Sequence, residues 1–91
     1  MKRCRVRGRQ LYADGRPCLD TISVTPGRAA IVDGNIYSAD PIEVTVRSDG
    51  SFQVELAPSR FAGVYTFVLH NGVFKVRVPE ENEFTIAGGM A

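Results

Sequence analysis

Few residues in this sequence are of the types that perform chemistry, and no local spacing brings them together. His70 is the only histidine, and it lies in the turn-forming stretch HNG at residues 70–72. As a general base it would need a nucleophile and an orienting acid within hydrogen-bonding distance. No sequence pattern places Cys4, Cys18 or a serine beside it. We therefore expect His70 to be a structural residue of an exposed turn.

The two cysteines, Cys4 and Cys18, are too few for a disulfide framework and lack the spacing of a metal site. If residues 3–12 form a strand that turns back through residues 13–17 onto residues 19–25, Cys4 faces the far end of the second strand. The two sulfur atoms are then too far apart to bond. The sequence predicts two free structural thiols, with an intrachain disulfide and a redox or metal role as the alternatives.

The acidic residues fit turns and solvated loops better than cation sites. The Asp-Gly pairs at residues 14–15 and 49–50 are not followed by the oxygen-ligand spacing of a calcium loop. The run EENE at residues 80–83 is a charged stretch of the kind that is usually solvated. Glycine-rich phosphate loops and zinc spacings are absent from the sequence. We therefore expect a protein that is not an enzyme and that has no catalytic residue, metal ligand or cofactor.

The elements that position these residues are indicated by alternation of apolar and polar side chains, cut at short intervals by Gly, Pro, Asn and Asp. This pattern is typical of an all-β sandwich or barrel, with about seven or eight strands and no helix. The stretch VYTFVL is apolar on both faces and predicts a central strand. The predicted hairpins span residues 42–56 and 64–78, the stretch AAIVDGNIYS at residues 29–38 is a third, shorter candidate, and a last edge strand is expected at residues 84–86.

The stretch RCRVRGRQ, residues 3–10, has an arginine at every second position. In an extended strand these arginines share one side, while the small and apolar residues between them face the core. Charge is divided unevenly, because residues 1–30 carry +5 and the remainder carries −4. The sequence predicts a basic outer stripe that docks on an acidic protein surface, and a solvated strand face without a partner is the alternative. The stripe consists of Arg3, Arg5, Arg7 and Arg9.

A second candidate contact is Arg60 with Phe61, in the predicted loop SRFA at residues 59–62. An arginine beside an aromatic ring is favoured at contact hot spots, although Phe61 could instead cover the end of the core. The longest stretch without a charged residue, residues 61–74, is too short to span a bilayer. Met1 is followed by basic residues and no apolar segment, so a signal peptide is not expected.

Three stretches occur in an order that resembles the carboxypeptidase regulatory-like, or transthyretin-like, β-sandwich. They are VRGRQLYADGRPCLDTISVTP, VDGNIYSADPIEVTVRSDGSFQVELAPS and GVYTFVLHNGVFKVRVPEEN. In that family a G-x-x-x-D-x-x-G-x-P opening precedes a t-x-x-D-G-x-F-x-v-x-L hairpin and a G-x-Y strand. The matching positions are Gly8, Asp14, Gly15, Pro17, Asp49, Gly50, Phe52, Leu56, Gly63 and Tyr65. The resemblance implies one antiparallel, Ig-like sandwich over residues 1–86 and a flexible tail over residues 87–91.

The IVDG hairpin and the late FKVRVP strand are similar to small domains of virion proteins from tailed phages of actinobacteria. This resemblance implies a non-enzymatic virion accessory protein, made in the host cytoplasm. In the first hypothesis it is a capsid decoration or cementing protein that binds the major capsid protein, another virion protein or its own copies, forming a homo-oligomer on the particle. A tail or tail-tip structural or adhesion component is the alternative. Nucleic-acid binding is less favoured, because the net charge is only +1 and Tyr12 is the one aromatic residue near the stripe.

Overall fold

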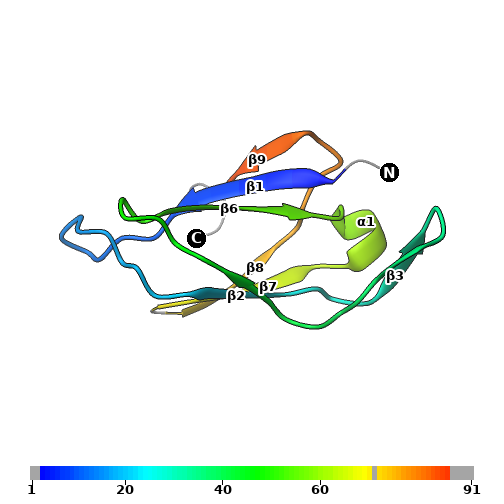
Figure 1. The fold of residues 1–91 in the computed structure, drawn as a ribbon, viewed down its shortest axis with the longest axis horizontal. Coiled ribbons are helices and arrows are strands. Elements are labelled where there is room, and N and C mark those ends of the chain that lie inside the picture. Colours follow the sequence, from blue (N-terminus) through cyan, green and yellow to red (C-terminus); the bar gives the residue numbers. More distant parts are fainter. Residues whose placement is uncertain (1–2, 71, 87–91) are drawn as a thin grey trace.

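The computed structural model describes residues 3–70 and 72–86, and nearly half of these residues belong to short strands (Figure 1). The predicted flexible tail at residues 87–91 and Asn71 of the predicted turn lie outside the described residues. The elements in chain order are β1 (Cys4–Arg9), β2 (Ile22–Thr25), β3 (Ala30–Val32), β4 (Asn35–Tyr37), β5 (Ile42–Val44), β6 (Ser51–Leu56), α1 (Ser59–Ala62), β7 (Tyr65–Leu69), β8 (Gly72–Val76) and β9 (Glu83–Thr85).

The described strands form one three-stranded, one four-stranded and one two-stranded sheet. The three-stranded sheet has the order β6-β1-β9, and the four-stranded sheet has the order β5-β2-β7-β8. These two sheets form the upper and lower layers of Figure 1, while β3 and β4 project beyond them at one end. The all-β prediction is confirmed at this level. One pairing departs from the expected antiparallel arrangement, because β9 runs parallel to β1.

The core lies between the two larger sheets and is built from the alternate residues that the sequence pattern predicted to face inward. On β1, Cys4 and Val6 are fully buried, whereas the arginines between and after them point outward. On β7, Tyr65 and Phe67 are buried in the same hydrophobic cluster. The VYTFVL stretch is a central strand as predicted, because β7 lies between β2 and β8.

Two predicted strand pairings are wrong, although the strands themselves are present. Residues 3–12 do not pair with residues 19–25, since β1 pairs with β6 and β9 while β2 joins the other sheet. Residues 42–47 and 52–56 do not form a hairpin either, because β5 pairs with β2 and β6 with β1. The tight turn between them, closed by Arg47 and Ser51, carries the chain from one sheet to the other. Period-two alternation determines which side of a strand is buried, but it does not determine the neighbouring strand.

The other two predicted hairpins are present. Strands β7 and β8 pair antiparallel, with Leu69 opposite Gly72 at the turn. Strands β3 and β4 pair around Asp33 and Gly34, whose φ angles are 53° and 79°. Positive φ at both central residues is the requirement of the type I′ turn, whose twist matches that of the flanking strands. The predicted hairpin at Asp33-Gly34 is therefore confirmed.

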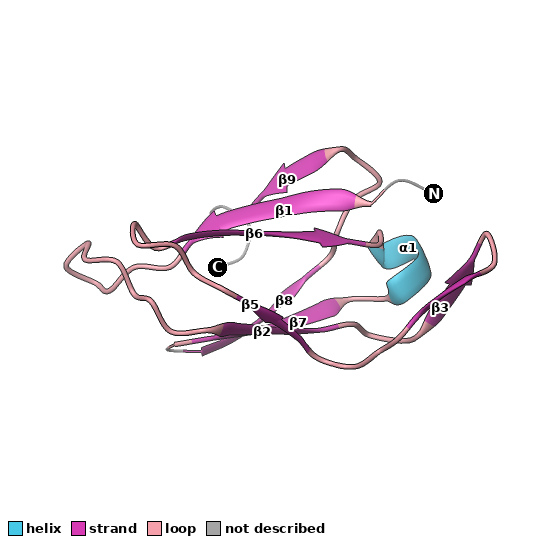
Figure 2. Cartoon of the chain, viewed as in Figure 1, coloured by secondary structure: helices cyan, strands magenta, loops and turns pink. Residues whose placement is uncertain are grey.

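The loop predicted at residues 59–62 is a single helical turn, α1, between β6 and β7 (Figure 2). The residues that flank this turn in the chain are joined, because the hydroxyl of Tyr65 donates a 2.6 Å hydrogen bond to the carbonyl oxygen of Ala57, and both residues are buried. Burial raises the pKa of Tyr65 to about 12. The phenol is therefore held in its neutral form as a donor.

Alkaline pH should destabilise the protein through this phenol. Because its folded pKa is raised above the unfolded value of about 10, its contribution is complete below pH ~10 and is lost as pH rises through about 12. By pH ~12 the loss from Tyr65 should reach about 1–3 kcal/mol. Denaturation curves at pH 8 to 12 should show this component in wild type and in a Tyr37→Phe control, but not in Tyr65→Phe. An equal alkaline loss in all three proteins would contradict the assignment.

Candidate functional site

The arginines of the predicted stripe do point outward from β1, and each is paired with a carboxylate of its own chain. Arg3 lies 3.3 Å from Glu55, and Arg9 lies 3.7 Å from Asp49. Arg7 lies 2.9 Å from Glu83. Arg5 bridges two neighbouring strands, at 3.8 Å from Glu55 on β6 and 3.5 Å from Glu83 on β9.

These ion pairs of Arg3, Arg5, Arg7 and Arg9, together called the arginine ladder, weaken the stripe as a docking surface for an acidic partner. Four arginines face three carboxylates on the same surface, so the charge offered to an acidic partner is small. The side chains are about half exposed, and exposed ion pairs each contribute only about 0–1 kcal/mol. The arrangement fits a solvated strand face better than a docking face. The pairs with Glu83 also link β1 to the short strand β9 at the edge of the sheet.

Arg60 and Phe61 lie on α1, and Arg60 has a different ion-pair partner from the arginines of β1. The guanidinium group of Arg60 is 3.2 Å from Glu80 and lies over the Phe61 ring at 5.4 Å from its centroid. Arg28 donates hydrogen bonds to the carbonyl oxygens of both residues. Phe61 is half-buried, which agrees with the alternative that it covers the end of the core. Arg60 remains exposed, with an acceptor already beside it.

The most exposed large apolar side chains among the described residues are Ile31 and Ile36, which sequence reasoning did not single out. Each is 76% exposed, and they are direct partners across the β3–β4 hairpin. The hairpin projects beyond the two larger sheets (Figure 2), which agrees with the high exposure of both side chains. One feature of the sequence could have indicated this exposed pair. Apolar residues lie on both sides of Asp33-Gly34, in a segment too short to form a layer of the core.

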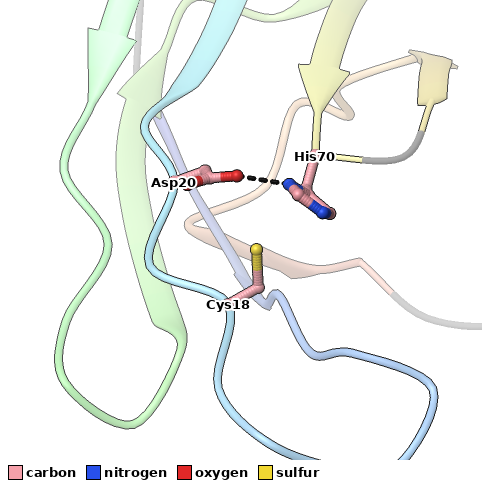
Figure 3. Close-up of side chains that lie close together, drawn as sticks. All are labelled: Cys18, Asp20 and His70. Atoms are coloured by element: carbon pink, nitrogen blue, oxygen red, sulfur yellow. Dashed lines mark hydrogen bonds and ion pairs between the residues drawn. The ribbon is translucent and has the colours of Figure 1, made fainter.

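A second group that the sequence did not bring together is a polar cluster of Cys18, Asp20 and His70 (Figure 3). The Asp20 carboxylate contacts Nδ1 of His70. The thiol of Cys18 points toward this pair from below, in a residue that is only 1% exposed. The side chains of Asp20 and His70 are 58% and 34% exposed. His70 is therefore more than a turn residue, because its ring is bound by an aspartate from the segment before β2.

Gln10 holds the backbone around this cluster. Its buried side-chain amide donates hydrogen bonds to the carbonyl oxygens of Cys18, at 3.1 Å, and Asp20, at 3.0 Å. Its Oε1 accepts a 2.9 Å hydrogen bond from the backbone N–H of His70. One side chain thus joins the end of β1, the segment before β2 and the β7–β8 turn.

Tyr12 covers the cluster from one side. Its ring meets the His70 ring edge to face, with 5.2 Å between centroids, and the guanidinium group of Arg16 lies 5.1 Å from the Tyr12 centroid. The pKa of the Tyr12 phenol is raised, first by its hydrogen bond with Cys18 and then by electrostatic repulsion from the same residue.

A thiol, an imidazole and a carboxylate are also the groups of a nucleophilic site, but the burial of Cys18 argues against that role. A nucleophilic sulfur must reach a substrate atom, and this one is almost fully enclosed. The other cysteine, Cys4, is buried in the core, and both thiols are free as the sequence predicted. Burial, followed by the charge of Glu81, raises the pKa of the Cys4 thiol.

Comparison with known proteins leaves the family open. No protein-family model matches the sequence, and no curated protein is significantly similar to it. Within residues 3–70 and 72–86, none of the helical segments has the length and apolar character needed to cross a bilayer.

Proposed function

We propose that this chain is a non-enzymatic binding protein: an accessory protein of a phage virion, most simply a capsid decoration protein made in the host cytoplasm. The proposal combines the transthyretin-like sequence resemblance with a surface suited to docking. In it, the two larger sheets form a single Ig-like sandwich, and the chain binds the major capsid protein or another virion protein. The β3–β4 hairpin with its two exposed isoleucines is the observation that carries the binding role.

The hairpin offers the apolar area that the arginine ladder lacks. Burying an isoleucine side chain that was exposed is worth about 1.5–3 kcal/mol. Ile31 and Ile36, at 76% exposure each, could therefore supply most of the affinity of a modest site. Modest sites suffice on a regular shell, because many copies bound in parallel gain strength through multivalency.

A groove of about 360 Å³ beside the hairpin supports the proposal that this surface binds a partner. Its lining combines Ile36 and Tyr37 of the hairpin with Ile42 of β5 and Ala62 of α1. A partner side chain that enters this groove would contact the hairpin and the body of the protein together. Apolar anchors that fill such pockets usually dominate the energy of an interface.

The copy number of this protein in purified particles tests the proposal. Quantitative mass spectrometry of the phage that encodes the chain should find on the order of hundreds of copies per particle if it decorates the capsid. A handful of copies, as in a small ring, would support the tail or tail-tip alternative. If the protein is absent from the particle, the proposal is wrong.

The docking surface is tested by paired substitutions. An Ile31→Ser/Ile36→Ser variant should remain folded, because neither side chain lies in the core, and its incorporation into particles should fall at least ~10-fold. Val73→Ser is the matched control, since Val73 is 62% exposed on β8 of the four-stranded sheet. Arg5→Gln/Arg7→Gln should retain incorporation. If the arginine variant loses incorporation and the isoleucine variant retains it, the docking surface is the arginine stripe and not the hairpin.

A further inference from the structure

We propose that Cys18, Asp20 and His70 form a binding site for a divalent transition-metal ion, with Zn²⁺ as the preferred occupant. The site goes beyond the proposed binding role, and it lies in a different part of the molecule from the β3–β4 hairpin (Figure 1).

The donor atoms are the types that zinc binds. Zinc in proteins is held by cysteine sulfur, histidine nitrogen and carboxylate oxygen, at about 2.0–2.3 Å, and tetrahedral ligand atoms then lie about 3.3–3.7 Å apart. The sulfur of Cys18, a ring nitrogen of His70 and a carboxylate oxygen of Asp20 all lie within 4.8 Å of one another. Closing around an ion therefore requires the donor atoms to move by about 1 Å. The ion would replace the hydrogen bond between Asp20 and His70.

The charge of the cluster suits a divalent cation. On binding, the Cys18 thiol releases its proton to solvent, so thiolate, carboxylate and neutral imidazole together carry a charge of −2. Two negative charges so close together, one of them on a buried sulfur atom, would be unfavourable without compensation. A divalent cation neutralises both charges. Three protein ligands leave a fourth position for water. The Tyr12 ring lies beside the cluster, edge to face with the His70 ring.

Access and support are also built into the site. Asp20 and His70 are partly exposed at its mouth, whereas Cys18 forms its buried floor, so an ion would enter from solvent between the two exposed side chains. Outer hydrogen bonds that hold the ligand-bearing segments are a regular feature of metal sites. Gln10 supplies them here, since it binds the backbone of all three ligand residues. The ion would join the segment before β2 to the β7–β8 turn.

Cobalt spectroscopy on the purified chain tests the site. Co²⁺ added to reduced protein at neutral pH should give a sulfur-to-cobalt charge-transfer band and the visible bands of a tetrahedral ion, saturating at one equivalent and bleached by Zn²⁺. Cys18→Ser should abolish the charge-transfer band. Zn²⁺ at about ten times its dissociation constant should raise the Tm of the wild type by roughly 5–10 °C.

The chain provides a matched control, because Cys4 is the other free cysteine and is buried in the core. Cys4→Ala should keep the charge-transfer band, and His70→Gln and Asp20→Asn should each weaken Co²⁺ binding at least ~10-fold. Absence of the band in wild type, or a band that survives in Cys18→Ser, would overturn the proposal. Both readouts use the isolated chain, so their outcome is independent of whether the protein is found in a virion.

Discussion

Replacing Gln10 with leucine is expected to lower the free energy of unfolding by about 3–6 kcal/mol. Leucine has a similar size but removes an amide that satisfies three backbone groups: the carbonyl oxygens of Cys18 and Asp20 and the N–H of His70. A buried backbone group left without a partner costs about 1–3 kcal/mol, reduced where water can reach it. A domain of this size has only about 5–14 kcal/mol in total, so the variant should lose a large part of its stability.

Chemical denaturation with an unchanged m-value measures this effect. Gln53→Leu is the matched control, because Gln53 is an exposed glutamine on β6, and its change should stay within about 0.5 kcal/mol. A Gln10→Leu variant as stable as the control would mean that water satisfies the three backbone groups, and that Gln10 does not hold the segments together. In the cobalt experiment the same variant should bind more weakly while retaining Cys18, Asp20 and His70.

The sequence predicted the parts of this fold that depend on local spacing. Alternation identified the inward face of β1, with Cys4 and Val6 in the core and the arginines outside. Asp33-Gly34 identified a hairpin because both residues accept positive φ. The pairing of β5 with β2 could not be predicted in this way, since a tight turn at residues 47–51 serves a hairpin and a crossing between sheets equally well.

The candidate sites depend on register and on contacts between distant segments, which the sequence pattern does not contain. The arginines were predicted on one face, but their neutralisation by Glu55 and Glu83 follows only from the pairing of β1 with β6 and β9. Cys18 and His70 meet because a turn in one sheet lies over the connection between the two sheets. One signal was present: Gln10 occupies an inward position of β1's alternation, and a polar side chain there requires hydrogen-bonding partners.

Replacing Gly50 with alanine is the second substitution with a large expected effect, a loss of about 3–5 kcal/mol. Gly50 has a φ of 84°, a conformation that residues with a Cβ adopt at a cost of about 1–2 kcal/mol. An added Cβ would also lie 2.5 Å from the carbonyl oxygen of Gln10 and 3.4 Å from Cα of Pro17. The turn would have to move away, which would break the 2.7 Å hydrogen bond from the Gln10 N–H to the Gly50 carbonyl.

Gly15 separates the two parts of this effect. Its φ is 90°, but an added Cβ there would meet nothing within 4 Å, so Gly15→Ala should show only the backbone cost of about 1–2 kcal/mol. The difference between the two variants, measured by denaturation under the same conditions, reports the contact between the β5–β6 turn and the end of β1. Equal losses in Gly15→Ala and Gly50→Ala would show that this contact relaxes freely. A larger loss in Gly50→Ala would show that the turn and Gln10 are held in place together, as the support of the Cys18, Asp20 and His70 cluster requires.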